Sequence, residues 1–266
     1  MTTAVMSDYL EGKFIDYILR QGSFPAPASV YLALFTTSPA DAGGGVEVSG
    51  GSYVRKQLTG AFGTPANGSV ANSAIISFIT ATANWGDVAA VGIFDAVSGG
   101  NLLFYGSFGA PLTVNTLDTL SIGAGNLVIT LGTNVSYFLA NEMLDHILNG
   151  ASFTQPTNAY LALYTTMPDA GDSGGVEVSG GSYARQQCFG SAEWAAPGAT
   201  DGHTQNVNTE TYPTATADWG TVIGMAIRSA VTAGSLYFFK TLTINRTVYT
   251  NDIFRFSAGE VDLTLS

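Results

Sequence analysis

Val46-Glu-Val-Ser-Gly-Gly-Ser-Tyr-Val-Arg55 occurs a second time in this chain, as Val176-Glu-Val-Ser-Gly-Gly-Ser-Tyr-Ala-Arg185. Two more blocks return in the same order: Tyr31-Leu-Ala-Leu-Phe-Thr-Thr37 as Tyr160-Leu-Ala-Leu-Tyr-Thr-Thr166, and Thr80-Ala-Thr-Ala-Asn-Trp-Gly86 as Thr214-Ala-Thr-Ala-Asp-Trp-Gly220. The offset between the copies is 129 residues at Tyr31 and 134 at Thr80. This period indicates a tandem duplication of a unit of about 130 residues, an ordinary size for one domain. The sequence therefore predicts two homologous domains, at residues 1–132 and 133–266.

The composition favours a β-rich protein with tight turns. Of the 266 residues 46% are hydrophobic, only 11% are charged, and 32 are glycine. The net charge of −11 disfavours nucleic acid and anionic membranes as partners, because their phosphates repel an acidic chain. No apolar stretch reaches the roughly 18–20 residues of a membrane span, and residues 1–7 lack the pattern of a secretion signal. We therefore expect a chain that is made in a cytoplasm and binds neither nucleic acid nor membrane.

Each copy begins with a helical pattern and continues with strands. Apolar residues recur at helical spacing between Tyr9 and Leu19, and again between Phe138 and Leu148. Residues 30–35 and 159–164 then have the pattern of buried strands, and further short strands follow at the spacing of a sandwich or barrel. The predicted fold is mainly β: two tandem homologous β-sandwich or barrel-like domains, each opened by one amphipathic helix.

The residues that usually carry catalysis are scarce. The two histidines are His146, which stands where the first helix has Tyr17 and is expected to serve the scaffold, and His203. His203 has Asp201 and Glu210 nearby in sequence, but no metal-ligand spacing joins them. The single Cys188 excludes an intrachain disulfide, and neither a nucleophile elbow nor a phosphate loop is present. We predict a protein that is not an enzyme and holds no metal or cofactor.

One pair of opposite charges is present in both copies. Glu47 and Glu177 are each followed, across a Gly-Gly turn, by an arginine, Arg55 or Arg185. In a hairpin the glutamate and the arginine would approach each other as a cross-strand pair. We predict that both pairs are structural ion pairs.

Aromatic residues supply the candidates for contact with partners. Trp85 and Trp219 end the repeated Thr-Ala-Thr-Ala-Asn/Asp block, and their repetition favours a role as core or domain-edge anchors, whereas Trp194 has no counterpart in the first copy. Trp194 belongs to the segment Phe189–Tyr212, which is longer than its counterpart Phe62–Ser77 and is expected to be a surface loop. Because tryptophan and tyrosine are enriched in contact hot spots, the interface candidates are Trp194, His203, Tyr212, Trp85 and Trp219.

The repeated blocks, together with Val91-Gly-Ile-Phe-Asp-Ala96 and Gly99-Gly-Asn-Leu-Leu-Phe104, resemble a family of small β-rich proteins of tailed bacteriophages. Its members are described as tail-fibre-like or virion-associated. The likeness covers nearly the whole chain, twice. It implies a structural component of the virion, made in the host cytoplasm, without fixing its place on the particle.

Three roles follow as expectations. The favoured one is a decoration or cement protein that binds and stabilises the capsid shell, because low charge suits permanent contact with other coat subunits; the other two are alternatives. The second is a tail-tip or tail-fibre attachment protein. The third is a carbohydrate-binding adhesin that would use Trp194, Tyr212 and Trp85. The expected partners are the major capsid protein or tail proteins, and the expected assembly is a homo-oligomer, with a trimer letting two domains per chain imitate a six-unit ring.

Overall fold

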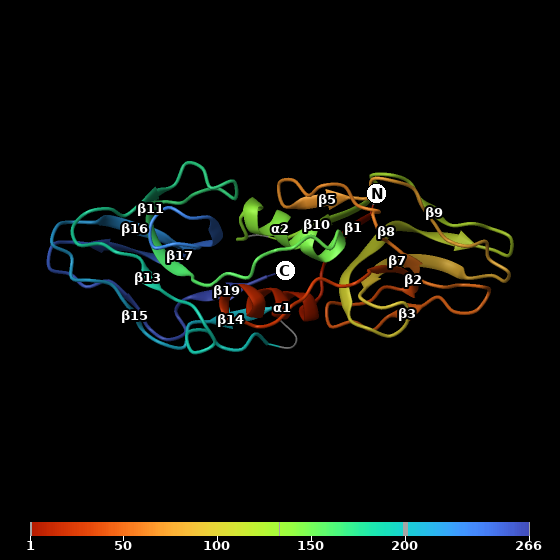
Figure 1. Cartoon of the computed structure of the whole chain (residues 1–266), viewed down its shortest axis with the longest axis horizontal. Coiled ribbons are helices and arrows are strands. Elements are labelled where there is room, and N and C mark those ends of the chain that lie inside the picture. The colour runs from red at the N-terminus through yellow and green to blue at the C-terminus, as the bar shows by residue number, and fades with distance from the viewer. Residues whose placement is uncertain (1, 133, 199–201, 266) are drawn as a thin grey trace.

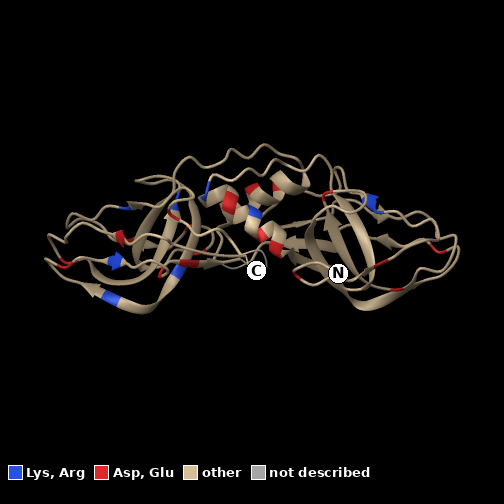
Figure 2. Cartoon of the chain, turned by 90° about the horizontal axis from the view of Figure 1, so that it is seen from below, with Lys and Arg blue, Asp and Glu red and all other residues tan. Residues whose placement is uncertain are grey.

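The computed structural model describes residues 2–132, 134–198 and 202–265. It is an elongated body of two β-rich lobes, one for each sequence repeat, with the two helices lying between them (Figure 1). Charged residues are sparse over the lobes, and several of them lie on these helices (Figure 2).

The first repeat contains one helix and ten strands. The elements are β1 (Thr2–Met6), α1 (Asp8–Leu19), β2 (Tyr31–Thr37), β3 (Val46–Glu47), β4 (Lys56–Gln57), β5 (Ser69–Ala71), β6 (Ile76–Ser77), β7 (Gly86–Phe94), β8 (Leu102–Val114), β9 (Ser121–Ile122) and β10 (Leu127–Thr130). Eight of these strands form one sheet, in the order β3-β2-β7-β8-β1-β10-β5 with β4 also paired to β2, and β6 pairs with β9.

The second repeat contains one helix and nine strands within the described residues. They are α2 (Tyr137–Leu148), β11 (Tyr160–Thr166), β12 (Val176–Glu177), β13 (Gln186–Gln187), β14 (His203–Gln205), β15 (Glu210–Thr211), β16 (Gly220–Arg228), β17 (Leu236–Val248), β18 (Arg255–Phe256) and β19 (Asp262–Thr264). Here the main sheet has five strands, and β14–β19 and β15–β18 are separate pairs.

The mainly β class and the tandem arrangement are confirmed, whereas the barrel-like alternative is wrong. Both main sheets end at unclosed edges within the described residues. The central strands are apolar on both faces: in β2, Leu32 and Leu34 face the main core, and Ala33 and Phe35 join a second cluster with Ala90. Burial of both faces explains why these strands appear in the sequence as continuous apolar runs rather than alternating ones.

The helix of the first repeat is preceded by a strand that has no full counterpart in the second. β1 runs antiparallel to β8, with Val5 opposite Tyr105, and parallel to β10, with Thr3 opposite Val128. In the second repeat the equivalent residues directly follow β10, and the described ones that pair with β17 are Asn134, Val135 and Ser136. The pair β14–β19 is therefore detached from the main sheet.

The residue at one equivalent position differs between the two arrangements: it is glycine in the first repeat and lysine in the second. Gly106 lies against β1 so closely that an added Cβ would stand 2.3 Å from the carbonyl oxygen of Thr3. The equivalent residue in the second repeat is Lys240, and its ammonium binds the carboxylate and the carbonyl oxygen of Asp262 on β19. The lysine thus reaches across the gap that β1 fills in the first repeat.

The helices join the repeats instead of belonging to one lobe each. α1 contacts β8 of its own repeat and β14 of the other, while α2 contacts β17 of its own repeat and β5 of the other. The backbone N–H of Gly68 donates to Asn141 on α2, and that of Gly190 donates to the carbonyl of Leu19 on α1. A single cluster of buried apolar side chains runs through both repeats. The predicted boundary at 132/133 adjoins residue 133, which lies outside the described residues.

Candidate functional site

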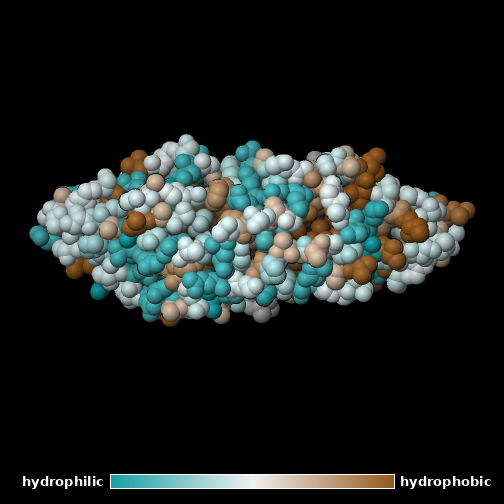
Figure 3. All heavy atoms as spheres, viewed as in Figure 1, coloured by the Kyte–Doolittle hydropathy of each residue, from teal (hydrophilic) through white to brown (hydrophobic). Residues whose placement is uncertain are grey.

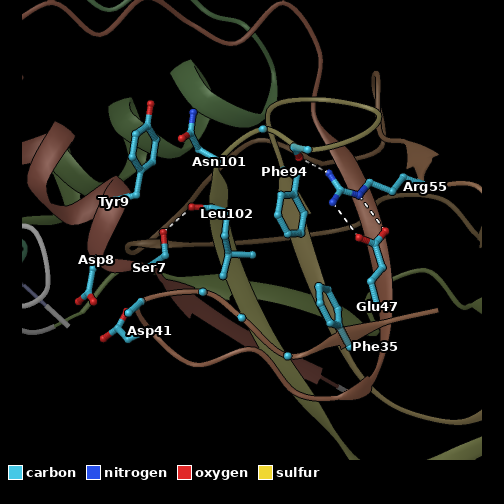
Figure 4. A pocket seen from close by; sticks show the side chains of 16 residues that line it. Ser7, Asp8, Tyr9, Phe35, Asp41, Glu47, Arg55, Phe94, Asn101 and Leu102 are labelled. Carbon is cyan, nitrogen blue, oxygen red and sulfur yellow. Dashed lines mark hydrogen bonds and ion pairs between the residues drawn. The ribbon is translucent and has the colours of Figure 1, made fainter. Parts of the chain in front are cut away.

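The repeated ion pair is the centre of a built polar site in each lobe. Arg55 Nε and Nη2 donate to the two carboxylate oxygens of Glu47, at 2.9 and 2.8 Å, and Nη1 donates to the carbonyl oxygens of Ala96 and Gly99. Its guanidinium carbon lies 3.7 Å from the centroid of the Phe94 ring. The fork geometry of arginine suits such a bidentate contact. The structure brings Glu47 and Arg55 together as the sequence predicted (Figure 4).

The second repeat keeps the pair and changes its neighbour. Arg185 contacts both oxygens of Glu177, at 2.8 and 2.6 Å. In place of Phe94 stands Arg228, which donates to the hydroxyl of Tyr164 at 2.7 Å and binds the carboxylate of Asp172. The same scaffold therefore presents an aromatic ring in one lobe and an extra cation in the other.

A tyrosine holds each glutamate from the other side. The Tyr53 hydroxyl donates to Glu47 Oε1 at 3.0 Å and accepts from the backbone N–H of Leu34, and Tyr183 does the same with Glu177 and Leu163. Burial raises the pKa of Tyr53 above its usual value, so the phenol keeps its proton and remains a donor. Tyr53 and Arg55 thus both bind Glu47 across the Gly-Gly turn, and the guanidinium also ties the turn to the backbone at residues 96 and 99.

Beside the pair of the first repeat lies an open pocket of about 470 Å³. Tyr9, Phe35 and Phe94 contribute its rings, and Asp8 and Asp41 stand at the opposite end from the ion pair (Figure 4). Phe94 is covered on one face by Arg55 and packs against Phe35 at 6.2 Å between ring centroids, with nearly parallel planes. Both faces of this ring are therefore in use within the chain.

Three carboxylates meet at the acidic end of the pocket. Asp8 and Glu11 in the first turn of α1, and Asp41 on the following loop, bring oxygen atoms within 4.8 Å of one another. Burial, then the charge of Asp8, raises the pKa of Asp41 above its usual value. Oxygen donors in such a group are the type that hard divalent cations take. Sequence analysis did not find this cluster, because Asp41 is thirty positions after Glu11 and no spacing rule connects them.

The equivalent place in the second repeat is apolar. The backbone N–H of Asp8 donates to Asp41 O, and that of Tyr137 donates to Ala170 O, which identifies Ala170 as the counterpart of Asp41. Tyr137 and Ala140 stand where Asp8 and Glu11 stand, and together with Ala170 they line a pocket of about 580 Å³. The acidic group is thus a property of one lobe and not of the repeated unit.

Four of the five interface candidates lie inside the core. Trp85, Trp219, Trp194 and Tyr212 are at most 5% exposed. The indole N–H groups of Trp85 and Trp219 donate to the carbonyls of Gly51 and Gly181, and that of Trp194 donates to Cys188. For Trp85 and Trp219 this burial agrees with a role as core anchors, and for all four rings it corrects the expectation that they are surface contacts for a partner or a sugar.

The described part of the longer segment of the second repeat, residues 189–198 and 202–212, is not a simple surface loop, because several of its side chains are buried. Trp194 forms a bridge with Asn206 where the first repeat has a bridge between Phe62 and Asn72, so the tryptophan replaces a core phenylalanine. The guanidinium of Arg20 on α1 binds the carbonyl oxygen of Trp194. The extra residues therefore help to hold the first helix against the second lobe.

The polar residues of that segment are spread over two strand pairs. His203 lies half-buried in β14, opposite Thr264, and Glu210 lies in β15, opposite Phe256. Burial, followed by the charge of Glu193, raises the pKa of Glu210 to about 7. Asp201 lies outside the described residues. The prediction that the chain holds no metal or cofactor stays a prediction.

Sequence analysis missed one repeated polar residue. Asn72 is 2% exposed, donates to the carbonyls of Ala74 and Gly123, and accepts from the backbone N–H of Leu127. Asn206 makes the equivalent three bonds in the second repeat. Its identity at an equivalent position in both copies was the available signal, but one shared residue between less similar segments was too weak to single out.

The family model described as podophage GP4 fiber I protein gp80 matches this chain twice, over residues 5–130 and 134–264. The two matches follow the two sequence repeats and together cover nearly the whole chain. No curated protein matches it. Among the described residues, no helix is both long and apolar enough to cross a membrane.

Proposed function

The chain belongs to the podophage GP4 fiber I protein gp80 family and is thus a bacteriophage structural protein, and from this premise we propose that it serves in a phage fibre as a rigid connector between two different neighbours. It works by binding and without catalysis. Its partners are other virion proteins, and further copies of the chain join it in a homo-oligomer. We place the fibre role ahead of capsid decoration because the family that matches both repeats is described by a fibre protein.

The observation that carries the proposal is the fusion of the two repeats through their helices. Each helix packs on both lobes, and the apolar core is continuous between them. A chain of two independent domains would bend at its linker, whereas this chain presents its two lobes in one fixed relation (Figure 1). A connector that transmits position along a fibre needs such stiffness.

The second support is the difference between the surfaces of the two lobes. Apolar groups are scattered over both (Figure 3), yet Leu112, 43% exposed in the first lobe, is replaced by Arg246 in the second. Leu117 is 80% exposed with φ of 74°, and its counterpart Asn251 has the same φ. Asparagine tolerates this left-handed conformation, whereas leucine is strained by roughly 1–2 kcal/mol. An exposed and strained leucine at residue 117 is explained by contact with a neighbour that the second lobe does not meet.

Localisation on purified particles tests the proposal. The protein carries an epitope tag in an exposed turn, and gold-labelled antibody is viewed by electron microscopy. The connector role predicts label on the fibres at a fixed distance from the tail. Label distributed over the head would reject it in favour of decoration, and label only at the outermost fibre tips would reject it in favour of the adhesin role.

A further inference from the structure

His146 has an unusual set of neighbours for a buried histidine. It lies in the last turn of α2 and is 5% exposed. Its Nδ1 is 2.8 Å from the carbonyl oxygen of Ala151, in its own repeat, and its Nε2 is 3.0 Å from the carbonyl oxygen of Phe24, in the first repeat. Both ring nitrogens therefore face acceptors, and the ring spans the junction between the repeats.

The counterpart of His146 makes the reciprocal contact. Tyr17 on α1 donates its hydroxyl to the carbonyl oxygen of Phe153 in the second repeat, at 2.7 Å. The Tyr17 and His146 rings are stacked, with centroids 5.9 Å apart and planes 19° from parallel. The two helices thus exchange one hydrogen bond each across an approximate two-fold relation. A tyrosine hydroxyl carries one proton to donate, and it keeps this proton over the whole pH range in which histidine changes its charge.

Histidine differs from tyrosine because its donor count depends on protonation. A neutral imidazole has one N–H and one lone pair, and an imidazolium has two N–H groups. A carbonyl oxygen cannot donate, so the neutral ring leaves one of the two contacts as a lone pair facing an oxygen. Only the imidazolium satisfies Ala151 and Phe24 together.

We propose that His146 is a proton-operated clasp between the two repeats: the protonated ring ties α2 and its following loop to the first repeat, and loss of the proton releases one of the two ties. The inference concerns the junction of the repeats and is independent of the fibre role.

The clasp rests on three features of geometry. The ring is stacked on Tyr17, it lies in the last turn of α2, and each of its nitrogens is within hydrogen-bond distance of a carbonyl oxygen.

Few charged groups lie close to the clasp on the packed elements. On α2 these are Glu142, one turn before His146, and Asp145, whose carboxylate accepts from Asn149. On α1 the carboxylate of Asp16 is paired with Arg20. Both paired carboxylates are engaged locally, so the two carbonyl oxygens remain the partners that the ring nitrogens reach.

The test compares the whole chain with its His146→Tyr variant, which installs the residue of the first repeat and keeps one donor toward Phe24. Both proteins also carry His203→Gln, which removes the other histidine of the chain. Urea unfolding is measured between pH 5 and pH 8, the range in which histidine changes its charge. Glu210 titrates in both proteins alike, and the comparison cancels it.

The clasp predicts that the ratio of the two unfolding constants changes with pH. Relative to the variant, the unfolding constant of the histidine protein rises about tenfold from pH 5 to pH 8, as expected for one buried hydrogen bond lost. In addition, the ¹⁵N spectrum of the folded protein at pH 5 shows protons on both imidazole nitrogens of His146. A ratio that stays constant over this range, or a ring with one unprotonated nitrogen at pH 5, would overturn the proposal.

Discussion

Replacing Gly106 with alanine places a methyl group in the path of the N-terminal strand. The added Cβ would stand 2.3 Å from Thr3 O and 3.0 Å from Ala4 Cα. Since carbon atoms in contact prefer about 3.5–4.0 Å, β1 must move by about 1 Å. That shift disturbs its pairing with both β8 and β10, and it disturbs the packing of Ala4 and Met6, which are at most 1% exposed.

The expected cost is the sum of overpacking and partial loss of burial. Overpacking costs about 1–3 kcal/mol, and exposing part of the Met6 side chain adds about 1 kcal/mol. We expect the free energy of unfolding to fall by about 3 kcal/mol, and Tm to fall by about 6–12 °C for a chain of this size. Urea and thermal unfolding give both quantities, and hydrogen exchange of the Ala4 and Val5 amides reports on the strand itself.

Gly109→Ala is the matched control, because it lies on the same strand and no atom comes within 4 Å of an added Cβ. Its effect should stay within about 0.5 kcal/mol. If Gly106→Ala were as stable as this control, with unchanged exchange of the β1 amides, β1 would not occupy the place between β8 and β10 and the reasoning would be refuted.

Four further predictions concern single side chains. Asn72→Ala removes three hydrogen bonds, and it leaves the buried backbone N–H of Leu127 without this acceptor while the Gly123 carbonyl keeps the N–H of Asn126, so the free energy of unfolding should fall by about 1–3 kcal/mol; a loss below about 0.5 kcal/mol in urea unfolding would count against the role of this amide. Arg55→Lys and Arg185→Lys should each cost about 2 kcal/mol, because lysine cannot make the bidentate contact, and the double variant should show the sum within about 0.5 kcal/mol; strong non-additivity would mean that the two motifs communicate. Trp194→Ala should lower the free energy of unfolding by about 3–5 kcal/mol, measured by thermal unfolding; an unchanged Tm would show that this ring is not part of the core. Glu210 has a pKa of about 7 in the folded protein against 4.5 for an ordinary glutamate, so stability that is present below pH 4.5 is lost as the pH rises through 7. Glu210→Gln should therefore be more stable than the wild type at pH 8 and nearly equal to it at pH 4.5. An identical difference in stability at both pH values would be inconsistent with a buried carboxyl group.

The sequence predicts those features of the fold that are local or repeated. The tandem repeat follows from blocks that occur twice, the two opening helices from the spacing of apolar residues, and the β-rich class from composition. Glu47 and Arg55 could be paired in advance because a Gly-Gly turn separates them by only a few residues. The same reasoning cannot detect β1, whose partner β10 lies more than a hundred residues away and whose slot depends on the missing side chain of Gly106.

Burial was harder to predict than pairing. Trp194 looked like a unique surface residue because no tryptophan occupies that position in the first copy. Only the bridge to Asn206 shows that it replaces Phe62 in the core. The acidic group of Asp8, Glu11 and Asp41 was invisible for a related reason, since its counterparts Tyr137, Ala140 and Ala170 carry no charge and comparison of the copies offered no signal.

The most direct test of the fused architecture is a distance distribution between spin labels on the two repeats. Ala83→Cys and Ala217→Cys place labels at equivalent exposed positions, and Cys188→Ala removes the native thiol. Electron–electron double resonance on the full chain should give one narrow distance peak, because each helix packs against both lobes and so fixes their relative position. A broad or two-peaked distribution would contradict the account, since it would show two domains that move independently on a flexible linker.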